Sequence, residues 1–131
     1  MRRILVVEDS ASTRSFIRAA LESSRTLGSC DIAEASSGFD ALRLLPRGPY
    51  DLVITDINMP DINGLELVQF IRKSDRHRST ALLIISTQSS EKDRIRGLSL
   101  GADEYLPKPL STDALISAVD RLLSSRPVAS G

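Results

Sequence analysis

The chain has 131 residues, of which 41% are hydrophobic and 26% charged, a composition typical of one soluble globular domain. Its 17 Lys and Arg balance 17 Asp and Glu, and this net charge of zero does not indicate a surface for nucleic acid or anionic membrane. A single cysteine, Cys30, excludes an internal disulfide, and a single histidine, His77, excludes a multi-histidine metal site. We expect Cys30 to be a small buried residue and His77 a solvated loop residue.

The first residues do not have the pattern of a targeting segment. Acidic residues at positions 8 and 9 follow the apolar run 4–7 at once, which is too short for a signal peptide. No apolar run approaches the length of a membrane span. Together with the single cysteine, these features predict a cytoplasmic protein that binds no membrane.

Short apolar runs predict five β-strands. Three are almost continuously hydrophobic, which is typical of parallel strands buried on both faces of a sheet. The other two are weaker, with polar residues interspersed. In chain order, the predicted strands are residues 4–7, 31–35, 51–55, 81–85 and 104–106.

Amphipathic segments fill the intervals and predict five helices. Their apolar residues are Phe16, Ile17, Ala20 and Leu21; Ala41, Leu42 and Leu45; Leu65, Val68 and Ile71; Ile95 and Leu98; and Leu115, Ala118, Val119 and Leu122. This alternation predicts an α/β fold with right-handed crossovers. Five units fit a flavodoxin-like, doubly wound (βα)5 three-layer sandwich with a parallel five-stranded sheet of order 2-1-3-4-5. We expect a domain over residues 1–124, and residues 125–131 as a flexible tail or the start of a linker.

Polar residues follow the predicted strands at the edge where α/β sheets bind ligands, namely Glu8, Asp9, Asp56, Ser86 and Lys108. Converging carboxylates repel each other, and a divalent cation would offset that repulsion. Ligands that are all oxygen favour Mg²⁺, or alternatively Mn²⁺, over zinc. Each residue alone also fits a solvated loop or a helix cap, so the joint pattern carries the inference. The ammonium and hydroxyl could surround a phosphoryl group.

Four blocks between Arg3 and about Leu123 resemble the receiver domains of two-component response regulators. They are the opening strand with its acidic pair, Ile4 to Ser10; the strand end and turn Asp56 to Pro60 with Gly64; Ser86; and the Lys-Pro segment Gly101 to Pro109. The segment Glu8 to Ala11 with Arg14, and the run from Asp56 to Leu67, look closest to chemotaxis-type single-domain regulators.

The resemblance implies a role for each site residue. Asp56 would accept the phosphoryl group, with Lys108 and Ser86 contacting its oxygens. Mg²⁺ would bind Asp9, Asp56 and the Asn58 backbone carbonyl, with Glu8 acting through a metal-bound water. Ser86 and Tyr105 would form the switch, and the peptide bond between Lys108 and Pro109 is expected to be cis.

Three positions modify this expectation. Glu8 stands where the family most often has Asp, and Thr87 is bulkier than the usual Ala, so it could restrict access to the site. Asn58 and Gln88 occupy the positions that tune the hydrolysis lifetime, and two polar amides predict an acyl phosphate that is not extremely long-lived.

The resemblance also implies the partners. The phosphoryl donor would be a sensor histidine kinase or a phosphotransfer protein. A downstream protein would bind the face of the fourth helix, fifth strand and fifth helix, after phosphorylation shifts the population between two states. The domain itself is expected to bind no nucleic acid. It would be no enzyme beyond its own phosphorylation and dephosphorylation.

Two other functions stay open. A phosphatase with an aspartate nucleophile typically has a second acid two residues on, where this chain has Asn58. A pseudo-receiver would bind partners without phosphorylation, and Thr87 is compatible with that reading. We further expect the cluster of Arg72, Lys73, Arg76 and Arg78 to be a solvated face, and Gly64 to adopt the positive φ of a tight turn.

Overall fold

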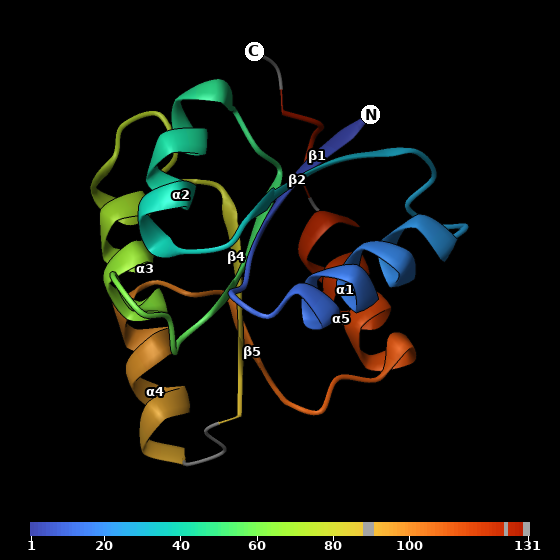
Figure 1. Ribbon diagram of the computed structural model, residues 1–131. Coiled ribbons are helices and arrows are strands. Elements are labelled where there is room, and N and C mark those ends of the chain that lie inside the picture. The colour runs from blue at the N-terminus through green and yellow to red at the C-terminus, as the bar shows by residue number, and fades with distance from the viewer. Residues whose placement is uncertain (88–90, 125, 130–131) are drawn as a thin grey trace.

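The computed structural model describes residues 1–87, 91–124 and 126–129. Strands and helices alternate along this part of the chain, and a short 3₁₀ helix follows the second α-helix (Figure 1). The elements are β1 (Arg2–Val7), α1 (Ala11–Ser23), β2 (Cys30–Ala35), α2 (Gly38–Leu44), η1 (Leu45–Arg47), β3 (Leu52–Asp56), α3 (Gly64–Lys73), β4 (Ala81–Ser86), α4 (Glu91–Leu100), β5 (Glu104–Pro107) and α5 (Thr112–Ser124).

The strands form one parallel sheet in the order β2-β1-β3-β4-β5. Helices α1 and α5 cover one face, while α2, α3 and α4 lie on the other (Figure 1). The predicted flavodoxin-like three-layer sandwich is therefore confirmed. Because all strands are parallel, their carboxyl ends lie along one edge of the sheet.

Alternate side chains of each strand pack into two separate cores. On β1, Ile4 and Val6 face α1 and α5, whereas Leu5 and Val7 face the α2 and α3 side. All four are buried. This double burial explains why the central strands are continuously hydrophobic. None of the helices in the described ranges is long and apolar enough to cross a bilayer.

Two residues expected in solvent are packed into the structure. His77 is only 4% exposed, in the turn between α3 and β4, so its assignment to a solvated loop was wrong. Arg72 is half-buried, and its guanidinium donates to the carbonyl oxygens of Gly101 at 2.8 Å and Thr80 at 2.6 Å. The predicted solvated face is therefore wrong for Arg72, which satisfies backbone carbonyls at the ends of neighbouring elements. Cys30 is half-buried on the edge strand β2, not fully buried as expected.

The two ends of the described chain meet at the amino-terminal edge of the sheet. The Arg2 guanidinium donates to the carbonyl oxygens of Leu123 at 2.9 Å and Pro127 at 3.1 Å. The backbone N–H of Ala129 donates to the buried carboxylate of Asp51 at 2.6 Å. Residues 126–129 therefore lie against the sheet edge opposite the carboxyl ends of the strands.

Candidate functional site

Three carboxylates gather at the carboxyl ends of two adjacent strands. Glu8 and Asp9 follow β1, and Asp56 ends β3. One oxygen from each lies within 4.8 Å of the others. Glu8 is fully buried and Asp56 is 5% exposed, whereas Asp9 is exposed to solvent. The structure thus brings together the acidic residues that the strand-end pattern singled out.

Lys108 completes this group from the loop after β5. Its ammonium donates to the Glu8 carboxylate and lies 3.4 Å from Oδ2 of Asp56. The Lys108 backbone N–H donates to the carbonyl oxygen of Ser86 at 2.7 Å, which holds the loop against the end of β4. The peptide bond from Lys108 to Pro109 is cis, as predicted, and the bond from Gly48 to Pro49 is cis as well.

The electrostatics of the group favour a cation. Burial opposes the Lys108 charge, but its hydrogen bond to Glu8 and the charges of Asp56 and Glu8 outweigh this effect and raise its pKa. A hydrogen bond to Glu8, burial and the Glu8 charge raise the pKa of Asp9. Three carboxylates against one ammonium leave excess negative charge, and the ligand atoms are all oxygens. This donor set fits a hard divalent cation such as Mg²⁺.

A hydrogen bond just after Asp56 closes the loop that joins β3 to α3. The Gly64 N–H donates to the carbonyl oxygen of Ile57 at 2.8 Å, and Asn63 begins α3 with a capping box that includes Glu66. A Cβ at position 64 would lie 2.1 Å from the Asp56 carbonyl oxygen. Among the described glycines, φ is positive at Gly28 and Gly101 but not at Gly64. The tight-turn prediction was therefore wrong, because the glycine is required by close approach of the backbone.

The other predicted site residues lie around this centre. Ser86 is buried at the end of β4, and Thr87 beside it is exposed. Asn58 is exposed on the loop after β3. Tyr105 is half-buried on β5, where its ring packs into the core on the α4 side of the sheet. Gln88 lies outside the described residues.

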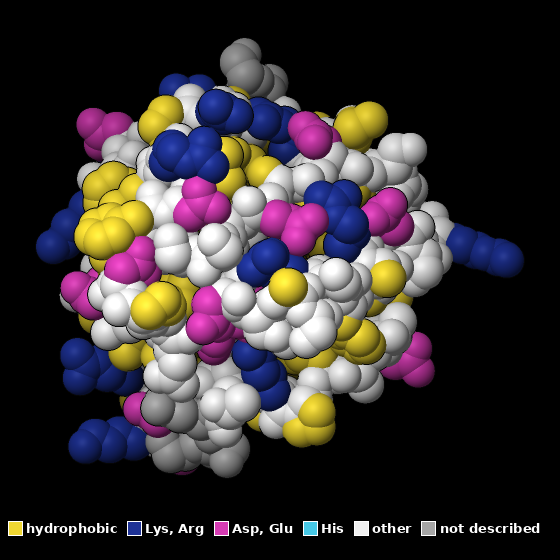
Figure 2. Space-filling model, viewed as in Figure 1, with side chains coloured by type: hydrophobic (Ala, Val, Ile, Leu, Met, Phe, Trp, Pro, Cys, Tyr) yellow, Lys and Arg dark blue, Asp and Glu magenta, His cyan; other side chains and the backbone are white. Residues whose placement is uncertain are grey.

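A groove of about 440 Å³ opens next to Lys108, between α1 and the loop before α5. It is lined by Ser12, Thr13, Phe16, Thr87, Lys108, Pro109 and Leu110. A larger cavity, about 740 Å³, is lined by residues that include Asp51 and Arg72, so it belongs to the opposite edge of the sheet and not to the carboxylate group. Figure 2 shows basic and acidic side chains interspersed over the viewed face, in keeping with the net charge of zero.

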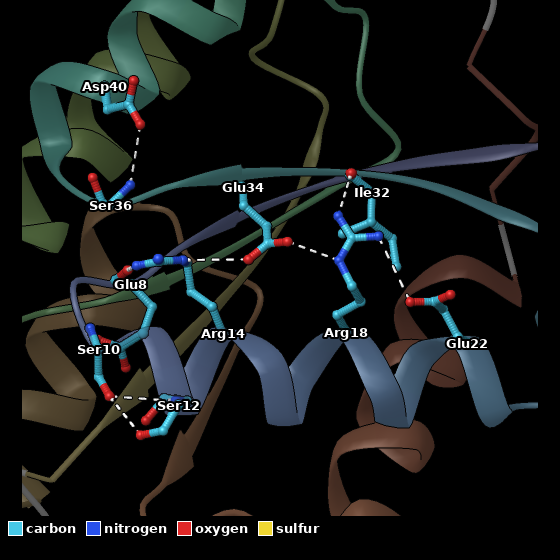
Figure 3. Close-up of polar contacts among 11 residues, drawn as sticks. Glu8, Ser10, Ser12, Arg14, Arg18, Glu22, Ile32, Glu34, Ser36 and Asp40 are labelled. Atoms are coloured by element: carbon cyan, nitrogen blue, oxygen red, sulfur yellow. Dashed lines mark hydrogen bonds and ion pairs between the residues drawn. The ribbon is translucent and has the colours of Figure 1, made fainter.

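One contact of the acidic pair was not foreseen from the sequence as part of the site. Arg14 on α1 donates through Nη1 to the carbonyl oxygen of Glu8 at 2.7 Å and through Nε to the Glu34 carboxylate at 3.3 Å (Figure 3). In the sequence, Arg14 is marked only by its likeness to the corresponding segment of chemotaxis-type regulators. Glu34 has the polar alternation of an edge strand and no motif, so its pairing with Arg14 becomes visible only in the folded chain.

Known response regulators match the chain in both sequence and fold. A probable transcriptional regulatory protein of Picosynechococcus is 39% identical over 128 residues, covering 92% of this chain and 49% of that protein. The transcriptional regulatory protein PrrA of Mycobacterium tuberculosis is 36% identical, covering 95% of this chain and 51% of its own length. The chain thus spans about half the length of these relatives.

Solved structures give the same result. The receiver domain of a Francisella response regulator has a TM-score of 0.85 at 32% identity, with 95% of this chain and 98% of that chain covered. The chemotaxis response regulator CheY4 of Vibrio cholerae has a TM-score of 0.84 at 29% identity, with 94% and 99% covered. Residues 4–120 match the response regulator receiver domain as a family. This chain therefore belongs to the receiver domains of two-component response regulators.

Proposed function

We propose that Asp56 is the phosphoacceptor of this receiver domain and that Glu8, Asp9 and Asp56 hold Mg²⁺ beside it. The observation that carries this proposal is the gathering of the three carboxylates within 4.8 Å, with the Lys108 ammonium 3.4 Å from Asp56. Asn58 would add its backbone carbonyl as a further ligand, and Mn²⁺ could replace Mg²⁺ because both prefer oxygen ligands. Glu8, which is paired with Lys108, would act through a metal-bound water.

The chemistry is a phosphoryl transfer in which the Asp56 carboxylate is the nucleophile. Its oxygen forms a bond to phosphorus while the bond from phosphorus to the donor histidine nitrogen breaks, which leaves an acyl phosphate on Asp56. Lys108 is placed to pair with the phosphoryl oxygens, and Ser86 supplies a hydroxyl from the end of β4. A bound Mg²⁺ supplies charge that offsets the repulsion between carboxylates and phosphate.

The phosphoryl group would then bias a switch in the β4–β5 half of the sheet. Ser86 would move toward the new oxygens, and Tyr105 would rotate into the space that this movement leaves. The face of α4, β5 and α5 would thereby change and bind a downstream protein. A histidine kinase or a phosphotransfer protein would supply the phosphoryl group. Asn58 and Gln88 would set a lifetime for the acyl phosphate that is not extremely long.

The wider setting of the domain has two candidates. The sequence motifs and the CheY4 structure favour a chemotaxis-type single-domain regulator. The transcriptional regulators at 39% and 36% identity favour a receiver from a longer transcriptional regulator, since the chain spans about half their length. In either case receiver domains are not enzymes in the usual sense, and we infer that this one catalyses only its own phosphorylation and dephosphorylation, in the cytoplasm. The domain would span residues 1–124, with residues 125–131 as a tail or the start of a linker.

The test is incubation with acetyl phosphate and Mg²⁺, followed by intact-mass measurement. Wild type is expected to gain one phosphoryl group, Asp56→Asn none, and the control Asp75→Asn one, because the Asp75 side chain is 99% exposed. An unmodified wild type would contradict the proposal and favour a pseudo-receiver. Steady hydrolysis of a phosphomonoester by the purified chain would favour the phosphatase.

A further inference from the structure

Arg14 connects the acidic pair to the edge strand β2. Its guanidinium donates hydrogen bonds to the Glu8 carbonyl oxygen at 2.7 Å and to the Glu34 carboxylate at 3.3 Å (Figure 3). The Arg14 side chain is 19% exposed. The Glu8 carbonyl belongs to the peptide unit whose nitrogen is that of Asp9. Because this unit is planar, fixing its oxygen also fixes the direction in which the chain enters Asp9.

The turn from Glu8 to Ser10 is held by further hydrogen bonds. The Glu8 N–H donates to the Ala35 carbonyl oxygen at 3.0 Å, and the Ser10 carbonyl oxygen accepts from the Arg14 N–H at 3.0 Å. The Ser10 N–H donates to the Glu8 carboxylate at 3.3 Å, and the Ser10 hydroxyl accepts from the Thr13 N–H at 3.3 Å to cap α1. Asp9 itself is exposed, so the direction of its carboxylate depends on the turn and on its hydrogen bond to Glu8 rather than on packing. Of these hydrogen bonds to the backbone of the turn, the charge-assisted bond from Arg14 to the Glu8 carbonyl oxygen is the shortest.

Glu34 is held in place from a second side. Arg18, one helical turn after Arg14 on the same face of α1, donates through Nε to Glu34 at 2.7 Å. Arg18 also donates to the Ile32 carbonyl oxygen at 2.9 Å, on β2 itself. Glu34 is thus a fixed anchor for Arg14, and Figure 3 shows the two arginines approaching it from opposite sides.

We propose that Arg14 is a positioning residue for the metal site. It holds the peptide unit between Glu8 and Asp9 so that the Asp9 carboxylate points toward those of Glu8 and Asp56. This inference rests on the proposed function, because it presumes that the three carboxylates bind a divalent ion. A residue that orients a metal-binding side chain without touching the metal itself typically contributes about 10–100-fold to metal affinity.

A Mn²⁺ titration tests the proposal without any phosphoryl donor. Binding is measured as the decrease in the electron paramagnetic resonance signal of the free ion. Arg14→Met is expected to weaken Mn²⁺ binding about tenfold, which is about 1.4 kcal/mol. The matched control is Arg18→Met, which also removes one guanidinium from Glu34 but leaves in place the bond from Arg14 to the Glu8 carbonyl oxygen. Its affinity is expected to stay within about twofold of wild type. Equal weakening in both variants, or none in Arg14→Met, overturns the proposal.

Arg14→Lys provides a second measurement if Arg14→Met does not fold. Lysine keeps the charge but lacks the planar fork that reaches two acceptors at once, so Mn²⁺ binding is still expected to weaken. Wild-type affinity in Arg14→Lys overturns the positioning role. Failure of the proposed function is recognised separately, because Asp9→Asn would then bind Mn²⁺ as wild type does, or wild type would bind none.

Discussion

Glu8 is the position where the acidic pair departs from the residue that the family most often has, an aspartate. Its side chain is fully buried, and its carboxylate accepts hydrogen bonds from the Lys108 ammonium and the Ser10 N–H. Lys108 is therefore already paired in this state of the domain, and a phosphoryl group on Asp56 would compete with Glu8 for the ammonium.

Gly64→Ala tests the close approach of the backbone behind Asp56. The new Cβ would lie 2.1 Å from the Asp56 carbonyl oxygen, so the loop must shift, and we expect a loss of about 3 kcal/mol in the free energy of unfolding. The control is Gly28→Ala, where φ is +65° but no atom lies within 4 Å of the new Cβ. Its cost is expected to be about 1 kcal/mol. Urea unfolding of both variants checks this, and equal losses would contradict it.

The turn that joins α3 to β4 contains a buried imidazole, that of His77. The backbone N–H of His77 donates to the Ser74 carbonyl oxygen, and the backbone N–H of Thr80 donates to the His77 carbonyl oxygen. The ring packs beside Gly48, just after η1, and its Nδ1 has no hydrogen-bond partner in the described structure. Burial and the Arg76 charge lower the pKa of His77, against a raising effect of the Leu45 carbonyl.

This burial predicts that the domain loses stability in mild acid. Above the unfolded pKa of about 6.5 the ring is neutral in both states, and its contribution is complete. As pH falls below that value, the unfolded chain takes up the proton first, so the free energy of unfolding decreases until the folded pKa is passed. His77→Phe removes the titrating group. Between about pH 7.5 and pH 5.5, wild type should lose more stability than the variant in urea unfolding; parallel losses would contradict this.

The elements themselves follow closely from the sequence, because each depends on local periodicity. Every predicted strand is present, although β1 begins at Arg2 and not at Ile4, and β3 ends at Asp56 and not at Thr55. The acidic group could also be predicted from the sequence, since a parallel topology places the carboxyl ends of all strands at one edge of the sheet. The burial of Arg72 could not be predicted, because its partners Gly101 and Asp103 lie 29 and 31 residues away and no local pattern marks them.

The charge balance of the whole domain hides an unfavourable local group. Net charge is zero, yet three carboxylates lie within 4.8 Å of one another. Their mutual repulsion opposes folding in the absence of a cation, and a cation that binds only the folded state offsets it. We therefore expect the stability of the domain to be coupled to occupancy of the proposed metal site.

Metal removal tests this coupling by thermal or urea unfolding. At a Mg²⁺ concentration ten times its dissociation constant, wild type should gain about 1.4 kcal/mol over the chelated protein. Asp9→Asn should be more stable than wild type in chelator, because one like charge is gone, and should gain nothing from Mg²⁺. Asp75→Asn, an exposed carboxylate, should respond as wild type does. A Mg²⁺ response that persists in Asp9→Asn would contradict the prediction.

The group formed by Glu8, Asp9, Asp56 and Lys108 joins residues from almost the full length of the chain. The ion pair of Glu8 with Lys108 spans 100 positions, and that of Asp56 with Lys108 spans 52. During synthesis on the ribosome, β1 and β3 therefore emerge with their acids long before the lysine that completes the site. If Asp56 is the phosphoacceptor, as we propose, a nascent chain presents the carboxylate before the ammonium, and we expect competence for phosphorylation only once β5 has joined the sheet.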